Sequence, residues 1–242
     1  MERESYNDMY IYEDVHWWFT ARRSILQKVL NQHCRYNNPK NILEVGCGSG
    51  GNLQMLKAYG DLFAMELDDN TREIANRRNI CDVKKGILPN DIPFDDRFDL
   101  ICIFDVLEHI DDDLETLKSL RKKLTHKGKL VITVPAYMFL WSAHDEANHH
   151  KRRYTRKQLK DIVSASGLSI IYTSYFNTIL FPIIAAVRII NNILNKNTES
   201  DVNLPSKPVN NLLKKIFSFE KTFLPTISFP FGVSIILIAK NE

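Results

Sequence analysis

The sequence predicts an α/β fold in which helices cover both faces of a mostly parallel sheet. Short apolar runs alternate along the chain with segments whose apolar residues recur at helical spacing. Residues 98–104 form a continuous apolar run, as expected of a strand buried on both faces. A glycine-rich turn, residues 46–51, lies between the first apolar run and a helical segment.

Seven strands are expected, and a helix separates most of the first six. The expected strands are residues 41–45, 62–67, 83–87, 98–104, 129–134, 168–175 and 233–239. The expected helices are residues 6–35, 52–58, a segment from the second strand through residue 78, 114–124 and 155–166. Gly167 is a plausible stop for the last of these helices. A polar and aromatic loop, residues 136–154, follows the fifth strand, and two amphipathic segments, 183–194 and 209–224, precede the last strand.

Composition limits the possible classes of protein. The 242 residues suit one α/β domain with an appendage, or two small domains. A net charge of +3 is too small to argue for nucleic acid as a partner. Four cysteines without a CxxC pair disfavour a zinc ribbon or a disulfide framework and fit a reducing cytoplasm. No signal-peptide pattern is seen, and no apolar run reaches the roughly 20 residues of a membrane-spanning helix.

The glycine turn predicts a nucleotide site. Glu44 precedes the glycines, and Glu66 ends the next strand 20 positions after Gly46. A carboxylate at that place holds ribose hydroxyls in doubly wound folds. Gly46, Gly48 and Gly51 also satisfy the dinucleotide spacing GxGxxG, so a dehydrogenase is an alternative. Glu44 would repel a pyrophosphate and favours a ligand with positive charge.

Four segments resemble the class I S-adenosylmethionine methyltransferases. They are EVGCGSG at 44–50, MELD at 65–68, PFDDRFDLICIFDVLEHI at 93–110 and GKLVITVP at 128–135. The resemblance implies a Rossmann-like, seven-stranded sheet and S-adenosylmethionine as cofactor. HWWFTARR at 16–23 and WSAHDEANHHKRRYT at 141–155 resemble a branch often linked to surface-glycan or lipid-precursor synthesis. The implied organisation is an N-terminal helical lid (1–38), a cofactor-binding core (39–175), a helical insertion (176–230) and the last strand (231–242).

The resemblance also implies roles for individual residues. Glu44 would orient the cofactor's amino group, Arg22 would reach its carboxylate, and Glu66 would bind the ribose. The expected cofactor-binding residues are Arg22, Glu44, Gly46, Cys47, Gly48, Gly50, Glu66, Leu67, Asp105 and Val106. One departure is that residues 85–88 lack the Asp that in many relatives accepts a bond from adenine.

The loop after the fifth strand is expected to meet the acceptor, because it lies over the carboxyl edge of the sheet. His144 would be a general base oriented by Asp145, with His149 as a further catalytic candidate; a solvated loop is the alternative. The histidine spacing matches no metal motif, so no metal is predicted. Lys151 to Arg153 would hold an anionic acceptor group or form a basic flank. The acceptor-site candidates are Trp18, His109, Trp141, Arg153 and Tyr154.

The amphipathic segments 183–194 and 209–224 suit a membrane surface, a dimer contact or packing on the sheet. The expected function is therefore methyl transfer to a small-molecule or lipid- or polyprenyl-linked acceptor. The enzyme is expected in the cytoplasm, where the amphipathic segments would hold it on the inner face of the membrane or join two copies in a homodimer. A non-catalytic subunit that binds S-adenosylmethionine is the alternative. Nucleic-acid substrates are disfavoured because Asp105-Val106-Leu107-Glu108 stands where an NPPY-type ending would lie.

Overall fold

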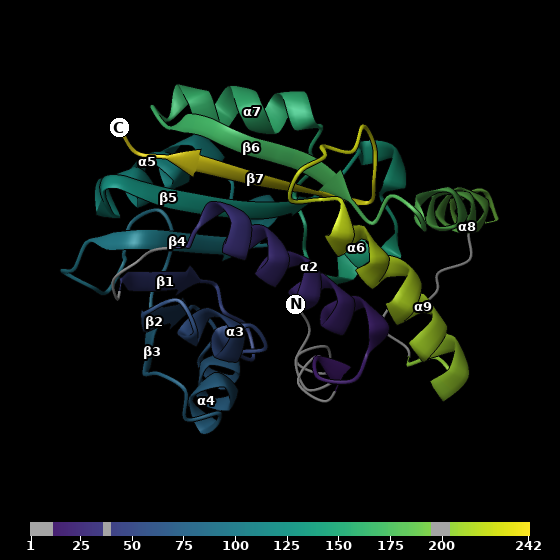
Figure 1. Ribbon diagram of the computed structural model, residues 1–242, viewed down its shortest axis with the longest axis horizontal. Helices are drawn as coiled ribbons and strands as arrows, with labels where there is room; N and C mark the ends of the chain where they lie inside the picture. The colour runs from purple at the N-terminus through teal and green to yellow at the C-terminus, as the bar shows by residue number, and fades with distance from the viewer. Residues whose placement is uncertain (1–11, 36–39, 195–203) are drawn as a thin grey trace.

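The computed structural model describes residues 12–35, 40–194 and 204–242. Seven strands of this part form one sheet in the order β3-β2-β1-β4-β5-β7-β6 (Figure 1). The strands are β1 Asn41–Val45, β2 Asp61–Glu66, β3 Val83–Lys85, β4 Phe98–Phe104, β5 Leu124–Pro135, β6 Ser169–Phe176 and β7 Ser234–Lys240. Only β7 runs antiparallel to its neighbours, β5 and β6. The expected seven-stranded, mostly parallel Rossmann-like fold is confirmed.

Helices cover both faces of the sheet. The α-helices are α2 Trp17–His33, α3 Leu53–Lys57, α4 Asp69–Arg77, α5 Asp113–Lys123, α6 Ala143–Ala147, α7 Arg156–Ala165, α8 Phe181–Ile193 and α9 Lys207–Phe219. The 3-10 turns are η1 Leu107–His109, η2 Met138–Leu140 and η3 Glu220–Thr222. Alternate residues of the central strands point to opposite faces, so that Leu100 and Cys102 join one apolar core while Ile101 and Ile103 join the other. The first core contains side chains of α2, α3 and α9, and the second contains side chains of α5 and α7.

The first helix is shorter than its sequence pattern predicts. Residues 6–11 of the expected helix lie outside the described residues, and the chain turns at 13–16 before α2 begins at Trp17. The ring of His16 accepts a hydrogen bond from the amide of Trp18 and so caps the helix. Val15, expected on the apolar face of the helix, is exposed instead. The cap stops the helix although the apolar spacing continues through it.

The loop at 136–154 contains more secondary structure than expected. It contains η2 and α6, and Ser142 and Asp145 form a reciprocal capping box at the start of α6. A second capping box, Thr155 with Gln158, starts α7 where a helix was expected. These caps fix the direction of the chain on either side of the loop.

The N-terminal helix packs against the C-terminal insertion. In Figure 1, α2 and α9 lie side by side on one face of the sheet. Phe217 of α9 is fully buried and stacks on Trp18 and on Phe176, with ring centroids 5.2 and 6.2 Å apart. The side chain of Asn210 accepts from the amide of Trp17 and donates to the carbonyl of Val15. The tryptophans at 17 and 18 therefore join two segments that are far apart in sequence.

Helix α8 has an unusual orientation. Ala185 is its only buried residue, and Ile183, Val187, Ile190 and Ile193 are each at least half exposed. Its polar side chains face the protein instead, since Arg188 donates to the carbonyl of Leu140 and Asn192 donates to that of Trp141. No helix of the described residues is long and apolar enough to cross a bilayer.

Candidate functional site

The glycine turn after β1 forms an open loop at the carboxyl edge of the sheet. Gly46, Gly48 and Gly50 have φ values of +66°, +56° and +84°, which L side chains rarely adopt. The amides of Gly46 and Cys47 donate to the carbonyl of Met65 and so attach the loop to β2. A Cβ atom built on Gly48 meets no atom within 4 Å, whereas one on Gly46 would lie 2.6 Å from the side chain of Val106. The loop therefore leaves free space above Gly48.

Glu66 lies at the end of β2, opposite the glycine loop. Its Oε2 accepts from the amide of Gly48 at 2.9 Å, and its Oε1 accepts from the amides of Leu67 and Asp68. Three donors thus hold the carboxylate in one orientation and leave Oε2 able to accept a further hydrogen bond. Leu67, beside it, is half exposed.

Glu44, the residue before Val45 and the loop, is almost completely buried. Asn52 donates to its Oε1 at 3.0 Å, but within the described residues its Oε2 has no hydrogen-bond partner. Desolvation raises the pKa of this carboxyl to about 8. A buried acceptor atom without a donor is costly unless a ligand supplies one. A cationic amino group would both donate to Oε2 and stabilise the charged form.

The end of β4 carries a strained and charged residue. Asp105 has φ +55° and accepts from the hydroxyl of Thr133, and its other oxygen lies 2.6 Å from Arg22. Arg22 is a buried residue of α2 that donates to Thr133 and lies over the ring of Phe104. The expected contact of Arg22 with a ligand carboxylate thus has a competitor in Asp105. Arg22 also links the N-terminal helix to the strand end where Asp105 and Val106 lie.

Glu13 is a site residue that the sequence did not point to. Its buried carboxylate accepts from the hydroxyl of Ser49 at 2.6 Å and pairs with Arg78 at 3.0 Å. Arg78 also donates to the carbonyl of Ser49. The segment before α2 is in this way attached to the glycine loop, next to Gly51. The sequence pattern placed Glu13 inside the expected helix 6–35 and gave no signal for this contact, because only the structure shows that the chain turns at 13–16.

A family model for a methyltransferase domain matches residues 17–173 of the chain. The chain belongs to this methyltransferase family. The expectation of a class I, S-adenosylmethionine-dependent methyltransferase is thereby confirmed, and the open loop, Glu44 and Glu66 fit the shape and charge of that cofactor. No match to the chain was found among curated protein sequences.

Solved structures with the same fold cover almost the whole methyltransferase chain. One is an S-adenosylmethionine-dependent methyltransferase of Thermotoga maritima, described as a possible histamine N-methyltransferase, with 16% identity, TM-score 0.60 and coverage of 98% of this chain and 99% of that one. Another is the complex of a Haloferax volcanii putative methyltransferase with its activator Trm112 (14%, 0.59, 96% and 91%). A third is a SAM-dependent methyltransferase from Archaeoglobus fulgidus (19%, 0.55, 95% and 97%). At these identities the likeness concerns the fold.

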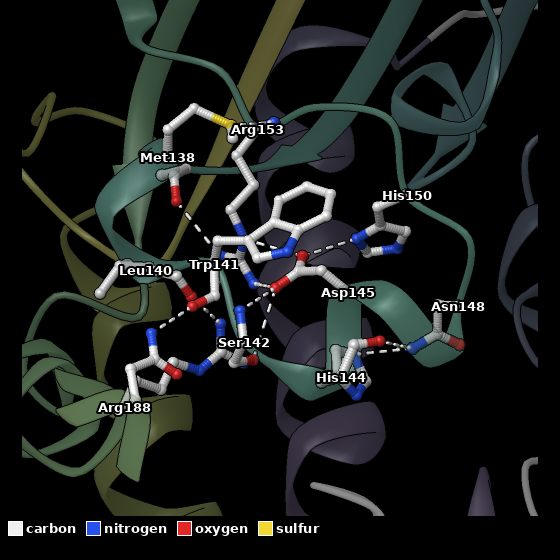
Figure 2. A network of polar contacts seen from close by, with 12 residues as sticks. Met138, Leu140, Trp141, Ser142, His144, Asp145, Asn148, His150, Arg153 and Arg188 are labelled. Atoms are coloured by element: carbon white, nitrogen blue, oxygen red, sulfur yellow. Dashed lines mark hydrogen bonds and ion pairs between the residues drawn. The ribbon is translucent and has the colours of Figure 1, made fainter. Parts of the chain in front are cut away.

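The loop after β5 is arranged around Asp145, which is fully buried. Its carboxylate forms two bonds with the Arg153 guanidinium, accepts from the amide of Ser142 and lies 2.7 Å from Nδ1 of His150 (Figure 2). These partners hold the pKa of Asp145 well below its usual range, although burial opposes them. The expected pairing of Asp145 with His144 is therefore corrected, because the carboxylate orients His150. In Figure 2 the dashed lines from His144 lead to Asn148, whose side-chain nitrogen lies 3.2 Å from Nε2.

Two expected acceptor-site residues have structural partners instead. Arg153 is buried and bonded to Asp145 and to the carbonyl of Ala136. Tyr154 is buried, and its hydroxyl donates to Asp113. A guanidinium that neutralises a buried carboxylate is not available to an anionic acceptor, so Arg153 and Tyr154 stabilise the loop. The neighbouring Lys151 and Arg152 are also ion-paired, with Asp111 and Asp113.

The remaining candidates fall into two groups. Trp18 packs in the core between α2 and α9, whereas Trp141 is half-buried at the contact with α8. His109 and His150 lie together, with ring centroids 4.7 Å apart, and the ring of His144 lies 6.1 Å from that of His150. His149 is exposed, with φ +55°. The structure thus groups three histidines beside the end of β4 and leaves the side chain of His149 at the surface.

Proposed function

We propose that this chain transfers a methyl group from S-adenosylmethionine to an oxygen or nitrogen atom of a small or lipid-linked acceptor. Two observations carry the donor side: Oε2 of Glu44 is buried without a partner in the described residues, and the space above Gly48 in the loop that follows is open. When bound, S-adenosylmethionine supplies a methyl group that its sulfonium has already activated. Glu44 would hold its amino group, Glu66 its ribose, and the loop at 46–50 its amino-acid part.

The chain's own residues would mainly provide alignment. Asp105 and Val106 stand where β4 ends, and Arg22 and Thr133 hold the carboxylate of Asp105 in place. Orientation of this kind accounts for a large part of the rate of a bimolecular transfer. The lid contact through Glu13 and Ser49 would exclude water from the cofactor side.

An oxygen acceptor also needs to lose a proton. We infer that His144 is the general base. It is half-buried in the loop at 136–154, called the acceptor loop below, where it lies near His150 and has Asn148 beside its Nε2 atom. General-base catalysis typically contributes about 10²–10⁴-fold. A nitrogen acceptor that reacts in its neutral form needs no such base.

The outward apolar face of α8 supports a lipid-linked acceptor. Arg188 and Asn192 bond α8 directly to the carbonyls of Leu140 and Trp141 in the loop after β5, so this exposed apolar helix is attached to the loop that would meet the acceptor. Exposed Lys214 and Lys215 on α9 would attract anionic lipids. The enzyme would then work at a membrane surface.

Transfer of a labelled methyl group tests the proposal. The full chain would be incubated with labelled S-adenosylmethionine and either a lipid extract or an aqueous metabolite pool. We expect label in the lipid fraction. Glu66→Ala should lose transfer through weaker cofactor binding, at about 1.5–3 kcal/mol per charge-assisted bond. His144→Asn should lower single-turnover rates while the cofactor dissociation constant stays constant.

The exposed Glu73→Ala on α4 is the matched control and should behave as the wild type. Label confined to the aqueous fraction would overturn the lipid-linked acceptor. Normal cofactor binding without transfer to any acceptor would instead support a non-catalytic, S-adenosylmethionine-binding subunit.

A further inference from the structure

Three potential metal ligands meet beside the end of β4. Glu108 and His109 belong to η1, which follows Asp105 and Val106 directly, and His150 comes from the acceptor loop. The amide of Lys151 donates to the carbonyl of Glu108 and fixes the two segments side by side. One carboxylate oxygen and one nitrogen of each ring lie within 4.8 Å of one another. An ion held at about 2.0–2.2 Å from each donor needs them at most about 4.4 Å apart, so a small inward movement suffices.

The side-chain oxygens of Glu108 have no hydrogen-bond partner among the described residues. The residue is completely buried. Burial and the nearby Asp105 raise its pKa. A buried carboxyl with two unpartnered oxygens destabilises the metal-free protein. The two nearby imidazoles do not donate hydrogen bonds to it, and each ring has another hydrogen-bond partner.

Both histidines are held as metal ligands usually are. Nδ1 of His150 faces Oδ1 of Asp145 at 2.7 Å. This contact favours the tautomer with the proton on Nδ1, in which Nε2 carries a lone pair that can bind a metal. His109 is hydrogen-bonded to the backbone of His149. Outer partners of this kind orient imidazoles toward a metal.

We propose that Glu108, His109 and His150 bind one divalent transition-metal ion. Two imidazoles and one carboxylate suit Zn²⁺, Mn²⁺ or Fe²⁺ and are a poor set for Mg²⁺. Three protein ligands leave at least one position open. Metal binding itself does not depend on the proposed methyl transfer.

The metal site lies beside the end of β4, next to Asp105 and Val106, and this position indicates which kind of acceptor is methylated. This part of the inference rests on the proposed function. An acceptor hydroxyl in the open position would lose its proton more easily, to a base such as His144. Its oxygen would then bond to the methyl carbon while the carbon–sulfur bond breaks and its electron pair stays on sulfur. The acceptor is accordingly an alcohol or phenol, and the product is a methyl ether.

Titration calorimetry with the chelator-treated full chain tests metal binding without cofactor or acceptor. We expect about one Mn²⁺ per chain, Mg²⁺ binding at least ten-fold weaker, and a higher melting temperature with Mn²⁺. Glu108→Gln and His150→Asn should each lose at least ten-fold in Mn²⁺ affinity. His126→Asn, at an exposed position on β5, is the matched control and should bind as the wild type.

The Tm shift produced by S-adenosylmethionine shows independently that each variant is folded. No Mn²⁺ uptake by folded wild type, or equal uptake by Glu108→Gln and His150→Asn, would overturn the site. Methyl transfer at an unchanged rate in the presence of chelator would overturn the role in acceptor activation, even if Mn²⁺ binds. Failure to find any transfer, with metal binding intact, would count against the proposed function alone.

Discussion

At the scale of single residues, the shape of the glycine loop depends on backbone conformation more than on side chains. Gly46 and Gly48 both have positive φ, yet they have different surroundings. Gly46 has the side chain of Val106 against it, whereas Gly48 faces free space. The same substitution at the two positions should therefore separate folding from binding.

Gly48→Ala should cost only about 1–2 kcal/mol of stability, from the left-handed conformation. It should nevertheless reduce S-adenosylmethionine affinity at least ten-fold, because the new methyl group enters the space above the loop. Gly46→Ala should destabilise the fold more, since its Cβ would lie 2.6 Å from Val106. Calorimetry and thermal melting of both variants are the measurements. Unchanged affinity in Gly48→Ala would mean that the cofactor does not approach this loop.

Glu44 gives a prediction about pH. Because its pKa is raised from 4.5 to about 8 in the folded chain, the folded state holds a proton that the unfolded state loses. The associated stability is present below pH 4.5 and is lost as the pH rises toward 8, by at most about 1.4 kcal/mol per unit. In Glu44→Gln, the melting temperature of the cofactor-free protein should fall less between pH 5 and 8 than in the wild type. Equal slopes in both proteins would remove Glu44 as the cause; the exposed Glu73→Gln serves as control.

At the scale of elements, the N-terminal helix α2 is held by α9 from the other end of the chain. Phe217 fills the space between Trp18 of α2 and Phe176 of β6, and Asn210 binds the backbone at the start of α2. The two helices therefore form one layer over the sheet, although Trp17 and Asn210 are 193 positions apart in the sequence. Because Arg22 of α2 pairs with Asp105, this packing also connects α9 to the end of β4.

Phe217→Ala should lower the free energy of unfolding by about 3–5 kcal/mol, because it removes a fully buried aromatic ring. Denaturant unfolding measures this effect. Phe219→Ala, at an exposed position on the same helix, should change stability by less than about 1 kcal/mol. Similar losses in both variants would indicate that α9 does not anchor α2 through Phe217.

At the scale of the whole molecule, α8 projects from the end of the sheet (Figure 1). Most of its apolar side chains are exposed. Contiguous exposed apolar residues of this kind mark an interaction surface. The polar side chains of Arg188 and Asn192 on the same helix bond to the loop after β5, so α8 is attached to that loop.

The full chain should bind vesicles containing anionic lipid, and Ile190→Glu combined with Ile193→Glu should weaken that binding at least ten-fold in co-sedimentation. Ile171→Glu, at an exposed apolar position on β6, is the control and should bind normally. If the double variant bound vesicles as well as the wild type, the membrane assignment would be wrong. A wild-type dimer that the same double variant makes monomeric would show that a second copy covers α8.

The sequence by itself determined the order of the strands along the chain, the glycine loop and the acidic residues around it. These features are local, because an apolar run, a glycine at positive φ and a residue at a strand end depend on neighbouring positions. Most strand boundaries, including those of β1 and β4, therefore agree with the sequence pattern. The tertiary structure alone decided which distant side chains meet. It pairs Asp145 with His150 rather than with the adjacent His144, buries Arg153, brings Glu13 to the glycine loop and places His150 beside Glu108. Spacing carries no record of these contacts, since they depend on how a loop and a sheet edge approach each other in space.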